Sequence, residues 1–319
     1  MRLADGYLNL TDQGEFPSLA SLKLEGGVFQ TFSSQNDRVN PEALLELAGG
    51  GLAPVYRSVR PAEEDVTNTQ HFAELAAHPG CATLDFTGGD GVSEIHFGKY
   101  GREGSLVSFT PSASGRVRFS AETLTGGSPV SPSTISPVVA GFITADGWNL
   151  LDRDPANGYL QTAALSETAG ADSNFLVPTG VATVSVTLVN SVVFDDVDAN
   201  AEFYFNTTGA AQVRSGMIVS RSQQARVKRI GTLEGGTLTT EMPGGLVIYD
   251  REINDRRQYA GYGGRYIIST TLADPVSGAP MAVTVAGMRN VLGGGCAGPF
   301  RKAQHLLGRV VSGQRWSLV

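Results

Sequence analysis

The chain has 319 residues, a formal net charge of −7, 17% charged residues and 40 glycines. This length allows two or three domains with sizeable cores. No run of 18 apolar residues occurs, so we expect no membrane span. No apolar segment follows Arg2 and Asp5, so we expect no secretion signal.

The composition predicts a mainly all-β fold. Charged residues are well below the roughly 25% of an average soluble domain, and glycine exceeds the usual ~7%. Valine, serine and threonine are plentiful, while long helical patterns are missing. Many short strands joined by glycine turns would produce this mixture. We therefore expect β-sandwich or β-barrel domains with a few short helices.

Residues 1–125 are predicted to form an N-terminal β-rich domain with two short helices. A hairpin is expected over residues 21–32, around a pair of glycines. The first helix is expected over residues 40–48, because Asn40 is a suitable N-cap and proline follows it. The second helix is expected over residues 69–77.

Residues 81–125 are predicted to form a β-meander with glycine-rich turns. In its last strand, Val117 and Phe119 point to one face, whereas Arg116 and Arg118 point to the other. This alternation is typical of a strand with one buried and one solvated face.

Residues 126–136 are rich in glycine, serine and proline, which predicts a loop or linker between two domains. Residues 137–319 are predicted to form a C-terminal β-rich domain that is basic after residue 200. Its longest strand-like run, residues 181–194, alternates apolar residues with serine and threonine. A short helix is expected over residues 300–307, and we find no internal repeat.

The charge is divided along the chain. Residues 1–199 hold 10 Lys/Arg against 24 Asp/Glu, and residues 200–319 hold 14 against 7. Either these charges mix on one folded surface, or the acidic part of one copy meets the basic part of the next. The second arrangement is head-to-tail and builds rings, stacks or filaments. The cations expected at that interface are Arg221, Arg226, Lys228, Arg229, Arg251, Arg256, Arg257 and Arg265.

Nucleic-acid binding is an alternative for the basic part, because Tyr259, Tyr262 and Tyr266 lie among its arginines. The sequence pI of about 5.2 argues against that as the main function.

Catalytic and cofactor motifs are missing. We find no serine nucleophile motif, no Cys/His pair at a recognisable spacing and no phosphate-binding glycine loop. We therefore expect no enzymatic activity and no cofactor. His71 and His78 would share a face of the second helix, with only Glu74 as a further ligand nearby. We interpret them as surface histidines rather than a metal site.

Two further features of the sequence are compatible with calcium binding and with a disulfide bond, respectively. Residues 196–200 match the first half of a calcium loop, yet Ala201 and Thr207 replace its glycine and glutamate, which favours an acidic turn. Cys81 and Cys296 could pair, but two reduced buried thiols are the better interpretation.

A glycan-cleaving enzyme would need two acids at a defined separation. Candidate pairs are Asp152 with Asp154, and those within the run Glu63, Glu64 and Asp65. Their separations cannot be derived from the sequence. Only two tryptophans, Trp148 and Trp316, are present to stack on sugars.

One segment carries a resemblance to a known family. Residues 91–124, which include FGKYGREGSLVSFTPSASGRVRFSAETL, are similar to the strand-and-loop pattern of tail-tube proteins of tailed bacteriophages. The resemblance implies stacked rings around an acidic channel, through which DNA passes without specific binding. It implies location in the virion after synthesis in the cytoplasm of a bacterial host. No functional residue is carried over.

Three functional hypotheses follow. The first is a self-assembling phage structural protein, a homo-oligomer that also contacts other virion proteins. The second is a tail-fibre, tail-tip or decoration protein that binds a host surface or a capsid. The third is a glycan-cleaving enzyme. Particle size distinguishes these hypotheses. The first predicts rings or stacks, the second predicts trimers, and the third predicts an active monomer.

Overall fold

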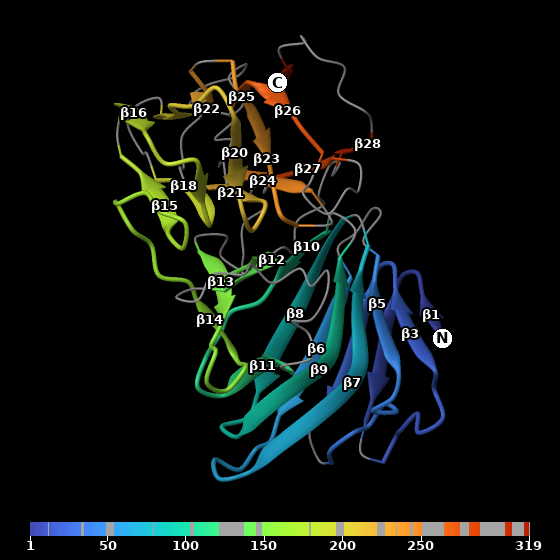
Figure 1. The fold of residues 1–319 in the computed structure, drawn as a ribbon. Coiled ribbons are helices and arrows are strands. Elements are labelled where there is room, and N and C mark those ends of the chain that lie inside the picture. Colours follow the sequence, from blue (N-terminus) through green and yellow to red (C-terminus); the bar gives the residue numbers. More distant parts are fainter. Residues whose placement is uncertain are drawn as a thin grey trace, which may run out of the picture.

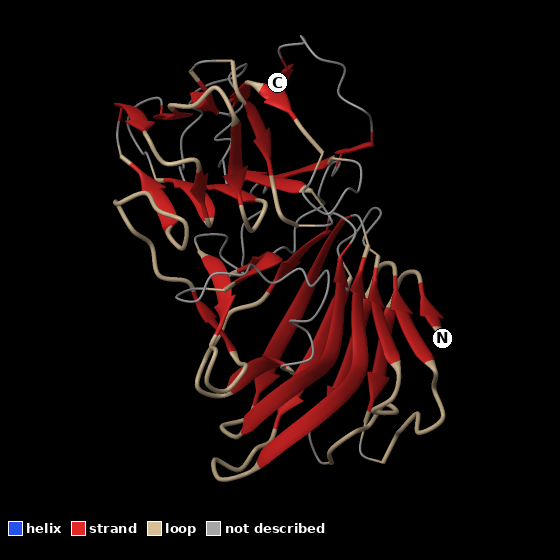
Figure 2. Ribbon diagram, viewed as in Figure 1, coloured by secondary structure: helices blue, strands red, loops and turns tan. Residues whose placement is uncertain are grey.

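The computed structural model describes residues 1–11, 13–32, 35–48, 54–78, 80–102, 105–120, 137–144, 149–178, 180–195, 201–221, 227–233, 235–242, 245–250, 265–274, 281–287, 304–307 and 316–318. Within these ranges the chain consists of strands and loops, with no helix (Figure 2). The predicted all-β class is confirmed. No helix in the described part of the chain is long and apolar enough to cross a membrane.

The N-terminal part is a parallel β-solenoid with two sheets (Figure 1). Successive strands alternate between the sheets, so each strand pairs with the one two further along. Sheet A contains β1 (Arg2–Leu3), β3 (Ser21–Leu24), β5 (Leu44–Leu47), β7 (Thr67–Ala77), β9 (Val92–Arg102) and β11 (Gly115–Phe119). Sheet B contains β2 (Tyr7–Leu10), β4 (Val28–Phe32), β6 (Val55–Arg60), β8 (Gly80–Gly88), β10 (Ser105–Ser108) and β12 (Val138–Ile143), then the antiparallel β13 (Leu150–Arg153) and β14 (Leu160–Thr162).

The C-terminal part is a second solenoid, in which each coil contributes to three sheets in turn. Sheet C contains β15 (Asn174–Val177), β18 (Ser191–Phe194), β21 (Met217–Ser220), β24 (Leu246–Asp250), β27 (Ala282–Gly287) and the antiparallel β28 (Gln304–Leu307). Sheet D contains β16 (Gly180–Val184), β19 (Ala201–Phe205), β22 (Val227–Thr232), β25 (Arg265–Ser269) and the antiparallel β29 (Trp316–Leu318). Sheet E contains β17 (Leu188–Val189), β20 (Ala210–Val213), β23 (Thr237–Thr239) and β26 (Thr271–Leu272).

Alternate residues of each strand fill the interior of the first solenoid. Phe72, Phe97 and Phe119 occupy paired positions on β7, β9 and β11. Their rings stack at centroid distances of 5.8 and 5.5 Å. In-register parallel pairing places like side chains one above another, so the apolar interior forms continuous columns.

The two solenoids share an apolar junction. On β21, Ile218 faces the interior of the second solenoid, whereas Met217 and Val219 belong to a separate cluster with Leu106 and Ile143 of the first. The central strands β18, β21 and β24 of sheet C are therefore buried on both faces over their described side chains, which explains their nearly continuous apolar sequences.

The expected sandwich or barrel architecture is wrong, because consecutive strands lie in different sheets rather than pairing with each other. The expected hairpin over residues 21–32 is β3 and β4, which belong to sheets A and B. The meander over residues 81–125 is likewise divided between both sheets. Residues 181–194 turn through three strands, β16, β17 and β18, one in each sheet of the second solenoid.

The two N-terminal helices are also wrong. Residues 69–77 lie in β7, and residues 44–47 form β5. Asn40 does cap a backbone group, since its Oδ1 accepts a hydrogen bond from the Glu42 amide at 3.1 Å, but it does so in a turn. Of the helix expected over residues 300–307, the described part is the strand β28.

The internal repeat was missed because the coils vary in length. The paired positions Arg2 and Lys23 are 21 residues apart, whereas Leu44 and Glu74 are 30 apart. The expected linker, residues 126–136, lies outside the described residues. Strands β12 to β14, which follow it, continue sheet B of the first solenoid, and the sheets change only between β14 and β15.

Candidate functional site

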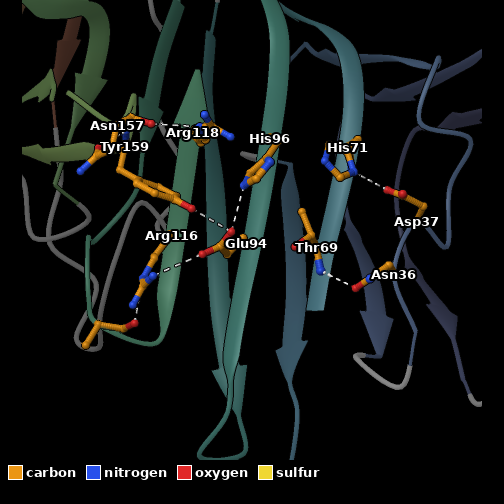
Figure 3. A network of polar contacts seen from close by, with 11 residues as sticks. Asn36, Asp37, Thr69, His71, Glu94, His96, Arg116, Arg118, Asn157 and Tyr159 are labelled. Atoms are coloured by element: carbon orange, nitrogen blue, oxygen red, sulfur yellow. Dashed lines mark hydrogen bonds and ion pairs between the residues drawn. The ribbon is translucent and has the colours of Figure 1, made fainter. Parts of the chain in front are cut away.

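The outer face of sheet A carries two rows of polar side chains across three neighbouring strands (Figure 3). One row is Thr69, Glu94 and Arg116, and the other is His71, His96 and Arg118, with one member each on β7, β9 and β11. The strands are parallel and in register, so the members of each row lie side by side on one face. We call these six residues and Tyr159 the sheet A array.

Glu94 is the centre of the array. Its Oε2 accepts a hydrogen bond from the Tyr159 hydroxyl at 3.0 Å and lies 2.9 Å from Nε2 of His96. Its Oε1 lies 3.3 Å from Nη1 of Arg116. The Glu94 side chain is only 9% exposed, so these three partners replace most of its hydration.

Tyr159 is held over β11 by the loop that precedes β14. It forms an isolated antiparallel bridge with Arg118, and the guanidinium carbons of Arg116 and Arg118 lie 5.8 and 5.9 Å from its ring centroid. Nε of Arg118 donates to the Asn157 carbonyl at 2.9 Å. The loop is closed by Asp154, whose Oδ2 accepts from Asn157 Nδ2 at 2.6 Å. These contacts fix both the ring and the Arg118 side chain.

The opposite end of the array is fixed by the loop before β5. The Asp37 Oδ1 accepts from the His71 amide at 2.8 Å and lies 2.9 Å from Nδ1 of the His71 ring. The Asn36 side chain accepts from the Thr69 amide at 2.8 Å. The rings of His71 and His96 meet edge to face at 4.9 Å.

Burial shifts the pKa values of two members. Burial lowers the pKa of His96, and the neighbouring Glu94 only partly opposes this. His96 is therefore neutral at pH 7, so its Nε2–H donates to Glu94 and its Nδ1 remains an acceptor. Burial, followed by the hydrogen bond to Glu94, raises the pKa of Tyr159, so the phenol stays protonated and acts as a donor.

The array suits binding better than acid–base chemistry. Both oxygens of Glu94 are engaged by donors, so this carboxylate is not free to exchange a proton with a substrate. The other acid, Asp37, is separated from it by both histidine rings. What the array offers a ligand is a set of fixed hydrogen-bond donors and acceptors on the outer face of sheet A.

Three of the predicted interface cations are described by the structure, and they lie outside the array. Arg221 pairs with Asp195 at 2.6 Å, and Arg229 pairs with Glu202 at 2.6 Å. Lys228 is buried. A role for these three at an interface between copies stays a prediction. The remaining predicted cations, Arg226, Arg251, Arg256, Arg257 and the side chain of Arg265, lie outside what the structure describes.

The other sequence candidates do not form a site among the described residues. Asp152 is buried in β13, whereas Asp154 closes the neighbouring turn. Glu63, Glu64 and Asp65 lie together in an exposed turn. No group of three or more His, Cys, Asp and Glu in the described chain could hold a metal ion.

The calcium-loop segment 196–200 lies outside the described residues, as do Cys296 and Trp148. Cys81 is buried in β8.

The sequence predicted one neighbouring pair of the array correctly and assigned a wrong neighbour to His71. It placed Arg116 and Arg118 together on a solvated face, as the structure does. It grouped His71 with His78 on a helix, whereas β7 brings His71 to His96 on the next coil. Glu94 and Tyr159 were missed, because 65 positions separate them and no local pattern links them.

Comparisons with family models, with curated proteins and with solved structures found no match to this chain.

Proposed function

We propose that this chain is a binding protein whose sheet A array holds an extended glycan, such as a polymer of a cell surface, without cleaving it. The observation that carries the proposal is the in-register pair of polar rows across β7, β9 and β11. Strands in a sheet are about 4.8 Å apart, so each row presents a hydrogen-bonding side chain at every step. Solenoids provide long, rigid faces of this kind.

The polar character of the face favours a glycan over a protein partner. Protein interfaces centre on buried aromatic or aliphatic anchors. Among the described residues, the large apolar side chains with substantial exposure are Met1, Tyr7, Val66 and Leu233, and none belongs to the array. A ligand rich in hydroxyl groups can use histidine, threonine, arginine and tyrosine as donors and acceptors at once.

This function agrees with the second of the three sequence hypotheses, a tail-fibre, tail-tip or decoration protein. Assembly into rings or stacks, contacts with other virion proteins and location in a virion stay predictions. They rest on the charge division and on the resemblance to tail-tube proteins. The glycan-cleaving alternative is less well supported, because both oxygens of Glu94 are already engaged by Tyr159, His96 and Arg116.

The experiment compares two arginines of similar exposure, each paired with a carboxylate, on different sheets. Arg116→Gln removes an arginine that is 41% exposed and paired with Glu94 in the array. Arg57→Gln removes one that is 33% exposed and paired with Asp85 on sheet B. Affinity electrophoresis against a panel of bacterial and plant polysaccharides should show binding that Arg116→Gln weakens and Arg57→Gln does not. A reducing-end assay should show no cleavage. Binding to no polymer, or equal loss in both variants, would refute the proposal.

A further inference from the structure

We infer that the glycan bound by the sheet A array is acidic, and that Arg118 is the residue that pairs with its acid groups. This inference rests on the function proposed above. The acid group is a carboxylate or a phosphate, since a guanidinium presents two parallel N–H donors to either.

Arg118 carries the charge in the array that no acid neutralises. Arg116 is paired with Glu94, whereas Arg118 has no carboxylate partner in the part of the chain that the structure describes. Its side chain is exposed. The ring of Tyr159 stabilises the guanidinium through its π face, but an aromatic ring does not cancel a charge.

A second arginine strengthens the positive field at this end. Arg153 is buried beside β11, where its Nε donates to the Phe119 carbonyl at 3.1 Å. Burial is the main cause that lowers the pKa of Arg153, and the positive charge of Arg118 lowers it further. An anion bound at Arg118 would offset the repulsion between Arg118 and Arg153. This makes a favourable electrostatic contribution to binding of the anion.

The geometry leaves the binding edge of Arg118 available. Its Nε is occupied by the Asn157 carbonyl at 2.9 Å, and this bond fixes the plane of the guanidinium. The two terminal nitrogens are then positioned in advance for a two-pronged contact with an acid group, which reduces the entropy lost on binding. Residues 1–199 as a whole hold 24 acidic against 10 basic residues, so the attraction of a polyanion comes from the local cations Arg118 and Arg153 and not from the net charge of this part.

The test uses charged and neutral forms of one polymer. Calorimetry at 50 and 200 mM NaCl measures the binding of four polymers. Polygalacturonate and its methyl ester are the matched acidic and neutral forms. Poly(ribitol phosphate) is a second anionic polymer, and dextran is a second neutral one. We expect the wild type to bind at least one of the two anionic polymers at least about tenfold more tightly than the ester, less so at high salt. The two anionic arms distinguish carboxylate from phosphate as the acid group.

Variants of Arg118 complete the test. Arg118→Gln should lower affinity for the acidic polymer at least about tenfold more than it lowers affinity for the ester, while Arg118→Lys should restore part of the difference. Circular dichroism confirms that each variant folds. Equal binding of acidic and neutral forms, or equal loss for both in Arg118→Gln, would overturn the inference and leave the glycan-binding function standing. Binding of none of the four polymers would overturn both.

Discussion

Alkaline pH should destabilise this protein through a buried tyrosine at the end of sheet A, and removing one hydroxyl should reverse the effect. Tyr100 lies inside the first solenoid, between the rings of Phe119 and Phe142 at 5.5 and 5.4 Å. Its hydroxyl donates to the Ala140 carbonyl at 3.0 Å. Burial raises the pKa of Tyr100 from its ordinary value of 10.0 to about 12.

The direction of the effect follows from proton linkage. Above pH 10 the unfolded chain loses this proton, whereas the folded chain keeps it up to about pH 12. The contribution of Tyr100 to stability is therefore complete below pH 10 and is lost as the pH rises through the folded pKa. Between these two pKa values the loss approaches about 1.4 kcal/mol per pH unit, and it totals about 2 kcal/mol by pH 12 because the folded tyrosine itself titrates there. At neutral pH, Tyr100→Phe loses only the hydrogen bond, at a cost of about 1 kcal/mol.

The stabilities of wild type and Tyr100→Phe should therefore cross. The free energy of unfolding is measured by urea titration with circular dichroism at pH 8 and at steps from 10 to 12. We expect the variant to be the less stable protein at pH 8 and the more stable one at pH 12. Tyr7→Phe is the control, since Tyr7 is 56% exposed, and the difference between this variant and the wild type should not change over the same pH range. A difference between wild type and Tyr100→Phe that does not change with pH would refute this reasoning.

Three further changes test the interior and the array. Phe97→Ala should cost about 3–5 kcal/mol of unfolding free energy, because its ring stacks between two others, while Phe97→Leu should cost less; a cost below about 2 kcal/mol would contradict the stacked interior. Arg102→Met should stabilise the chain by about 1–3 kcal/mol in the same urea assay, since the buried guanidinium has no hydrogen-bond partner among the described residues, and destabilisation would show that it has one. Glu94→Gln should lower the pKa of His96 in an NMR titration, because the carboxylate is what raises it, whereas Arg118→Gln should raise it; the same direction in both would contradict the electrostatics of the array.

Strand content and strand faces followed from local sequence. The alternation around Val117 and Phe119 is confirmed, since both are buried while Arg118 on the same strand is exposed. The two N-terminal helices were predicted wrongly because capping residues and helical spacing are also local features, which tertiary pairing can override. The Asn40 side chain can accept a hydrogen bond from any nearby backbone amide, and in the structure it accepts one within a turn. In β7, the residues expected to form a helix alternate between the solenoid interior and solvent over most of the strand.

Residue types and their spacing were sufficient to determine that this chain is built of strands, and which side chains of a single strand share a face. Only the tertiary structure decided which strands are neighbours, and so which side chains form the array. The physical reason is the distance over which a parallel solenoid makes its hydrogen bonds. Each strand of the N-terminal sheet A pairs with one that lies 21 to 30 residues away, and coils of unequal length conceal that period. His71 meets His96, and Glu94 meets Tyr159, because the coils close on one another.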